Sequence, residues 1–290
     1  MSSPPGTLTC SPVTCSTALA RSRPVVTICI PHWQGGPLIK LCLRSVRRFT
    51  DAPPFEVIVI DNGSKDASLD YLRSVRWIRL FERPEETHAN WPLNIASAWD
   101  MGVREAKGKH FLIMHADVFA RRAGWLRLFV DALEKDDRVG AAGGWKLETP
   151  DPLYAALKRA TDFKALRLWV LRKLGRPAPP PPNRELYPRD YCAIYRVAPI
   201  REHGFSFVQR GHTPGQEMFE QMRSVGYVAE MIPVPELMRF IHHVAHGTAG
   251  VTAEAPLGHG RSQRKVARRM DELLAEPLVR ELLADESLDK

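Results

Sequence analysis

The chain has 290 residues, of which 44% are hydrophobic and 26% charged, and 41 Lys and Arg stand against 33 Asp and Glu. These proportions are typical of globular proteins and argue against a disordered, collagen-like or disulfide-stapled chain. The net charge of +8 favours anionic partners such as phosphates, nucleotides or lipid headgroups, and no apolar run approaches the roughly 20 residues that cross a bilayer.

The first 23 residues are rich in Ser, Thr and Pro and lack the continuous apolar region of a secretory signal, so residues 1–23 are predicted to be a disordered leader. The five cysteines are an odd number without a CxxC pair, which indicates reduced thiols in a cytosolic protein. They are Cys10, Cys15, Cys29, Cys42 and Cys192.

From residue 25 the chain alternates between short apolar runs and helical patterns. Strands are expected at 25–30, 55–60, 77–81, 110–114 and 139–147, with helices at 38–49, 68–75, 92–106 and 124–135. Such alternation predicts an α/β fold, in which helices cover both faces of a mostly parallel sheet.

The regular alternation stops near residue 150. Further along the chain we expect a basic helix at 153–176, a Pro-rich break at 177–182, an extended segment at 191–197, a helix at 216–225, a strand at 227–234 and a helix from 261 interrupted by Pro277. The basic residues and Trp169 within 158–176 suit a helix that lies on an anionic membrane. A cationic surface helix packed on its own domain is the more common explanation of the same pattern.

Polar residues that directly follow buried strands are the first candidates for a ligand site, because ligands of open parallel sheets bind at the carboxyl ends of the strands. Three groups qualify: Pro31, His32 and Trp33; Asp61, Asn62, Gly63 and Ser64; His115, Ala116 and Asp117. The first strand is not followed by a GxGxxG turn, which argues against a dinucleotide enzyme.

Two of these groups allow a functional and a structural interpretation. Asp61 could direct its carboxylate at a nucleoside, or it could cap its own turn, and the residues alone do not separate the two. His115 and Asp117 are two positions apart, so an extended backbone would point both side chains to one side, where they could bind a divalent cation. A site that combines an imidazole with a carboxylate suits Mn²⁺ better than a site of oxygen ligands alone, which is typical of Mg²⁺. Ordinary loop polarity is the alternative.

Four blocks in order resemble family 2 glycosyltransferases, which have the GT-A fold. They are VVTICIPHWQ from Val25, FEVIVIDNGSKDAS from Phe55, GVREAKGKHFLIMHADV from Gly102 and FEQMRSVGY from Phe219, and the likeness covers about residues 25–248. The resemblance implies a GT-A domain over 24–248, with an acceptor-side insertion at 151–190 and a C-terminal helical extension at 249–290.

The resemblance also implies roles for particular residues. Pro31 and Asp61 would line the nucleotide pocket, together with His32, Trp33, Asn62, His115 and Ala116. Asp117 corresponds to the last Asp of the family's DxD motif, which binds the metal chelated by the donor diphosphate. His115 replaces the first acidic residue of that motif.

Inverting transfer requires a carboxylate that takes the acceptor proton. Glu217 is the candidate base, because Gln216-Glu217 stands near the place of the family's Glu-Asp pair. A solvated carboxylate in the first turn of a helix is the alternative. His243 and His246 resemble the late His that adds a metal ligand or phosphate contact in the family, although a polar surface turn would also explain them.

The sequence therefore predicts an inverting glycosyltransferase of glycan, glycolipid or polysaccharide biosynthesis. Expected partners are a nucleotide-sugar donor, UDP-linked as is common in this fold, Mn²⁺ or Mg²⁺, and a glycan or lipid-linked acceptor, with no nucleic acid. We expect a cytoplasmic protein, peripheral at the inner membrane face if 158–176 contacts lipid. Two alternatives stay open: a catalytically degenerate glycan- or membrane-binding module, and a sugar nucleotidyltransferase, although the loop 34–37 lacks the Lys or Arg that such enzymes use.

Overall fold

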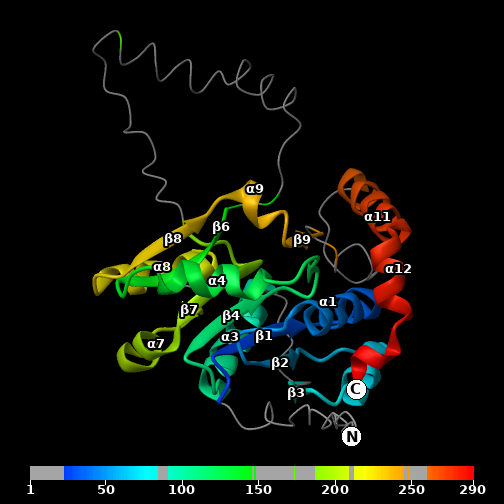
Figure 1. Ribbon diagram of the computed structural model, residues 1–290, viewed down its shortest axis with the longest axis horizontal. Helices are drawn as coiled ribbons and strands as arrows, with labels where there is room; N and C mark the ends of the chain where they lie inside the picture. The colour runs from blue at the N-terminus through cyan, green and yellow to red at the C-terminus, as the bar shows by residue number, and fades with distance from the viewer. Residues whose placement is uncertain are drawn as a thin grey trace, which may run out of the picture.

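The computed structural model describes residues 23–83, 91–145, 147, 173, 187–208, 212–244, 247 and 260–290. Its centre is a seven-stranded sheet with the strand order β3-β2-β1-β4-β7-β6-β8 (Figure 1). The strands are β1 (Val26–His32), β2 (Phe55–Asp61), β3 (Ile78–Glu82), β4 (His110–Met114), β6 (Val139–Gly144), β7 (Cys192–Arg196) and β8 (Val228–Ile232).

The sheet is mixed but mostly parallel, which confirms the predicted fold class. Strands β3, β2, β1 and β4 are parallel to their neighbours, as are β6 and β8. Strand β7 runs antiparallel to β4 and to β6, with Met114 opposite Cys192. As a consequence, β7 begins at the sheet edge where β1, β2 and β4 end.

Helices cover both faces of the sheet, because side chains alternate along each buried strand. Ile28 and Ile30 pack in the core beneath α1 (Gly36–Phe49), α2 (Ser68–Ser74) and α4 (Trp125–Glu134). Cys29, between them, packs in a second core beneath α3 (Trp91–Glu105), α7 (Val197–His203) and α8 (Pro214–Ser224). A short helix, α9 (Val234–Leu237), follows β8.

The first strand is longer than its sequence predicts. It was expected to end at residue 30, before Pro31, yet β1 continues to His32 opposite Asp61. Strand β4 pairs with β1 only from Val26 to Cys29. At Pro31, β1 therefore has one neighbouring strand instead of two. Because no strand pairs with Pro31 on the β4 side, a backbone N–H is not needed there.

A second, two-stranded sheet was not expected. It joins β5 (Val118–Ala120) to β9 (Ile241–His243) in antiparallel register, with Val118 opposite His243. Residues 241–243 thus form a half-buried strand, and the interpretation of His243 as part of a surface turn is wrong. His246 lies outside the described residues.

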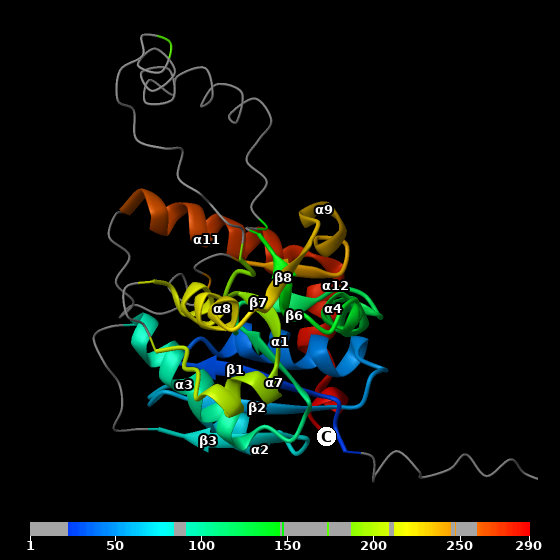
Figure 2. The ribbon, with the colours of Figure 1, turned by 90° about the vertical axis from the view of Figure 1, so that its left-hand side faces the viewer.

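The C-terminal helices pack on the main domain. α12 (Pro277–Ala284) packs against α1, and α11 (Gly260–Ala275) contacts α12. The short 3₁₀ helix η2 (Glu286–Asp289) brings the C-terminus close to α2 and β3 (Figures 1 and 2). Pro277 starts a new helix, as its position predicts. Apolar residues of both helices form a third core with Leu38, Leu41 and Phe119.

A buried ion pair fixes this C-terminal segment. Arg44 of α1 donates from Nε to Asp289 Oδ1 at 2.9 Å, and its other nitrogens reach the carboxylate and the carbonyls of Leu282 and Leu283. Tyr71 also donates its hydroxyl to Asp289, at 2.8 Å. One guanidinium thereby ties the C-terminal segment to α1.

We expect Asp289→Asn to lower the free energy of unfolding by about 1–3 kcal/mol, because a buried guanidinium loses the charge that compensates its desolvation. The matched control is Glu281→Gln, which removes the exposed partner of Arg48 and should cost at most about 1 kcal/mol. Urea unfolding of both variants measures the difference. Equal losses would contradict a special role for the Arg44–Asp289 pair.

Several expectations fall on undescribed parts of the chain. The predicted leader, apart from residue 23, and the basic stretch 158–176, apart from Lys173, lie outside the described residues, as does the Pro-rich break. The domain boundaries remain predictions. Within the described residues, none of the helices combines the length and apolar character that a membrane crossing needs.

Candidate metal and donor site

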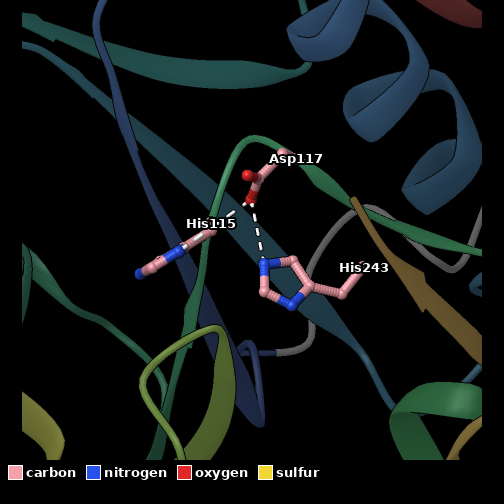
Figure 3. Close-up of side chains that lie close together, drawn as sticks. All are labelled: His115, Asp117 and His243. Carbon is pink, nitrogen blue, oxygen red and sulfur yellow. Dashed lines mark ion pairs between the residues drawn. The ribbon is translucent and has the colours of Figure 1, made fainter. Parts of the chain in front are cut away.

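Three predicted residues converge at the carboxyl edge of the sheet. His115 and Asp117 lie in the turn between β4 and β5, and His243 ends β9 (Figure 3). The Oδ1 atom of Asp117 is 3.5 Å from His243 Nε2 and 3.9 Å from His115 Nδ1. One ligand atom from each residue lies within 4.8 Å of the others. The pairing of β5 with β9 brings His243 to this place.

The two carboxylate oxygens of Asp117 have different surroundings. Its Oδ2 atom accepts a hydrogen bond from the Gly247 N–H at 3.0 Å, while Oδ1 is buried without a hydrogen-bond partner among the described residues. A buried oxygen of this kind is costly unless something compensates it. Two imidazole nitrogens and one carboxylate oxygen form a donor set that suits Mn²⁺ and other transition metals, so these residues fit a divalent metal ion.

The protonation states also fit a metal. Burial lowers the pKa of His115, more than the negative charge of Asp117 raises it. Burial raises the pKa of Asp117, but His243, His115 and the Gly247 N–H together hold it below its usual value. A metal ion requires a neutral imidazole and an ionised carboxylate. The surroundings favour both states at neutral pH.

Aromatic rings hold the two imidazoles in place. The ring of Trp99 stacks on His115, with centroids 5.7 Å apart, and Tyr191 stacks on His243 at 4.9 Å. The Tyr191 hydroxyl donates to the Trp145 carbonyl at 2.7 Å, and the Tyr191 carbonyl accepts from the His115 N–H at 2.9 Å. These contacts limit the rotation of both candidate ligands and so preorganise the site.

The predicted donor-binding residues line the same edge. Asp61 accepts from the backbone N–H groups of Gly63 and Ser64 at 3.0 and 2.9 Å, and from the Ser64 hydroxyl at 2.5 Å. The Asp61 side chain thus caps its own turn, which is the structural interpretation of the sequence pattern. In this role it fixes the loop that presents Asn62, itself bonded to Arg83 at 3.1 Å.

His32 is buried beside that turn. Its Nε2 atom lies 2.8 Å from the Ser68 hydroxyl, and its Nδ1 atom has no hydrogen-bond partner among the described residues. Burial lowers the pKa of His32 to about 4, against the charges of Asp61 and Asp66. The imidazole is therefore neutral at pH 7. Trp33 is half-buried and Ala116 is buried at the same edge.

Glu217 stands on a separate element. It lies in the first turn of α8 and is only 7% exposed, which differs from the solvated carboxylate that the sequence also allowed. The segment 187–190 lies between this turn and the candidate metal residues His115, Asp117 and His243. On the side of α8, the Tyr187 hydroxyl lies 3.2 Å from Thr213 Oγ1, and a Cβ atom at Gly215 would lie 3.3 Å from Asp190 Oδ1. Glu217 is not one of the three clustered ligands.

Several residues of the site have no counterpart in the sequence analysis. Trp99 and Tyr191 stack on His115 and His243, and Arg189 and Asp190 act electrostatically on His115. Three of them directly precede β7. They precede their strand instead of following it, because β7 is antiparallel and the residues before it lie at the edge where β1, β2 and β4 end.

A family model described as Glycosyl transferase family 2 matches residues 27–204, and a search of curated protein sequences finds no match. A mannosyltransferase from Pyrobaculum calidifontis, in complex with GDP-Man and Mn²⁺, has a similar structure at 19% identity and a TM-score of 0.52, over 91% of this chain and 74% of that chain.

Two further structures are less similar. S. aureus TarS, residues 1–349, matches at 15% identity with a TM-score of 0.49, over 89% of this chain and 69% of its own. A glucosyl-3-phosphoglycerate synthase from Mycobacterium tuberculosis matches at 15% identity and a TM-score of 0.49, over 75% and 71%. At these identities, the comparison with the mannosyltransferase establishes a shared fold.

Proposed function

Since this chain belongs to glycosyl transferase family 2 and is a glycosyltransferase, we propose that it moves a sugar from a nucleotide-diphosphate donor to an acceptor hydroxyl, with inversion. The observation that carries the proposal is the buried Asp117 oxygen between His115 and His243, at the edge where β1, β2 and β4 end. In open α/β sheets this edge is where nucleotides bind.

In this proposal the metal ion is held by His115, Asp117 and His243, with His246 as a further predicted ligand. A bound Mn²⁺ or Mg²⁺ would supply Lewis-acid stabilisation of the charge on the departing diphosphate. The turn at Asp61 and Asn62, with Pro31, His32, Trp33 and Ala116, lines the nucleoside side of the pocket.

Glu217 is the proposed base. It would accept the proton of the acceptor hydroxyl as that oxygen bonds to the anomeric carbon, while the diphosphate leaves from the opposite side. Low exposure favours this role, because a carboxylate shielded from water interacts more strongly with the charges that develop in the reaction.

For the donor we propose a UDP-sugar, with a GDP-sugar as the matched alternative because the mannosyltransferase of similar fold is described with GDP-Man and Mn²⁺. The proposed acceptor is a glycan or a lipid-linked sugar in polysaccharide biosynthesis. The proposed location is the cytoplasm, with 158–176 as the segment that would contact the inner face of the membrane.

Nucleotide binding in the presence of metal tests the proposal most directly. At 100 times Kd a ligand stabilises the native state by about 2.7 kcal/mol, which corresponds to a rise in Tm of about 5–10 °C for a chain of this size. We expect such a rise with UDP or GDP plus Mn²⁺, and a much smaller one with the nucleoside alone or with EDTA present.

The thermal shifts also separate the proposal from its rival. Absence of a metal-dependent shift with every nucleoside diphosphate would contradict the donor site and leave a degenerate binding module. A positive result with one base identifies the donor nucleotide and justifies a search for the acceptor.

A further inference from the structure

A second feature lies beside the metal residues: an arginine set in a corner between two aromatic rings. The rings of Trp145 and Tyr187 meet nearly at right angles, with centroids 5.5 Å apart and an interplanar angle of 82°. The guanidinium carbon of Arg189 lies 5.3 Å from each centroid. Cation–π contacts of this kind hold a guanidinium in place without using its N–H donors.

Among the described residues, Arg189 uses little of its hydrogen-bonding capacity. Its Nη1 atom donates to the Tyr187 hydroxyl, and no further side-chain hydrogen bond is made by its guanidinium within the part of the chain that the structure describes. In the same part of the chain, no carboxylate lies within ion-pair distance of it. A guanidinium has five N–H donors, so Arg189 keeps a planar fork and a full positive charge for another partner.

The neighbouring carboxylate does not provide that partner. Asp190 packs toward the first turn of α8, where its Oδ1 atom would lie 3.3 Å from a Cβ at Gly215. A helix N-terminus is a favourable place for a negative charge. Among the described residues Asp190 therefore lies near this helix N-terminus and acts on His115, and it forms no ion pair with Arg189.

The corner is adjacent to the metal residues. The carbonyl of Trp145 accepts from the hydroxyl of Tyr191, whose ring stacks on His243. The Arg189 N–H donates to the Gly144 carbonyl at 3.0 Å, which fixes the backbone at the start of β7. The charge of Arg189 also acts on the nearby imidazole of His115.

We propose that Arg189, in the corner formed by Trp145 and Tyr187, binds a phosphate group of the substrate. A guanidinium can bind phosphate with two parallel hydrogen bonds. This binding is stronger when the guanidinium is already held in position than when it lies on a mobile surface side chain. The phosphate belongs either to the donor diphosphate or to a phosphate-bearing acceptor. The inference rests on the proposed function, because it takes the substrate to bind at the metal residues.

Calorimetric titration of four proteins tests the assignment: wild type, Arg189→Met, Arg189→Lys and the control Arg127→Met. Arg127 is exposed on α4 and lies 3.8 Å from Asp131. The probes are UDP and GDP, each with Mg²⁺, and inorganic phosphate added to the protein already saturated with nucleotide and Mg²⁺.

A hydrogen bond to a charged group contributes about 1.5–3 kcal/mol, so Arg189→Met should raise the affected Kd by about 10-fold or more. A rise in the Kd of the nucleoside diphosphate assigns the phosphate to the donor. A rise confined to inorganic phosphate assigns it to the acceptor. Arg127→Met should change neither.

Arg189→Lys keeps the positive charge but loses the fork, and it carries the test if Arg189→Met does not fold. We expect it to weaken the same probe by about threefold or more. If a folded Arg189 variant leaves both Kd values within twofold of wild type, the inference is overturned while the proposed function stands. If wild type binds no nucleoside diphosphate at all, both fail together.

Discussion

Asp117→Asn should reduce glycosyl transfer or donor hydrolysis by about 10³-fold and abolish binding of Mn²⁺. Lewis-acid stabilisation of the leaving diphosphate contributes several kcal/mol to the transition state, and about 4 kcal/mol corresponds to three powers of ten in rate. The amide presents a neutral oxygen where the structure places an ionised one, so the two imidazoles lose the anionic centre of their ligand set.

The measurement combines Mn²⁺ titration with turnover at saturating metal. Asp131→Asn serves as a matched control, since it makes the same change on the exposed face of α4 and should leave both quantities unaltered. His243→Gln should weaken the metal less than Asp117→Asn does, because the charged ligand remains. Retention of wild-type Mn²⁺ affinity by Asp117→Asn would remove the three residues from the role assigned to them.

Glu217→Gln is expected to lower kcat by about 10²–10⁴-fold, the range for loss of a general base, with little change in the Kd of the nucleoside diphosphate. The amide is close in size to the carboxylate but cannot accept the acceptor proton. A residue that only stabilised α8 would affect Tm and leave kcat of the folded fraction unchanged. Single-turnover kinetics with bound donor separates these effects.

Glu220→Gln is the control for this substitution, because Glu220 lies on the same helix and pairs with Arg223. It should retain full turnover. Asp190→Asn tests the alternative base. Asp190 is a half-buried carboxylate near both His115 and the start of α8. A large loss of kcat in Asp190→Asn, with Glu217→Gln near wild type, would transfer the role of base to Asp190.

The sequence predicted most strands and helices correctly, because these depend on local patterns. Buried β-branched runs marked β1, β2 and β4, and the polar residues after β4 were His115 and Asp117. The end of β1 was misplaced. Whether Pro31 breaks a strand depends on how far β4 extends beside it, and this is a property of the sheet and not of the segment.

The interpretation of Asp61 was left open for a related reason. Its side chain satisfies the backbone N–H groups of its own turn, and only atomic positions show which acceptors are used in this way. His243 illustrates the same limit over a longer distance. The family resemblance named His243 as a candidate, but no local pattern indicates that the segment 241–243 pairs with β5 and so reaches Asp117.

By itself, the sequence determined the α/β fold class, the family resemblance and the identity of His115, Asp117 and Glu217 as candidates, since hydrophobic periodicity and residue order are encoded along the chain. The tertiary structure alone decided which residues meet. Strand β7 runs antiparallel to β4, so Arg189 to Tyr191 lie at the edge where β1, β2 and β4 end. Strand β9 pairs with β5, which places His243 beside His115 and Asp117. Strand pairing between distant segments follows from the packing of the whole sheet, and a local pattern does not contain that information.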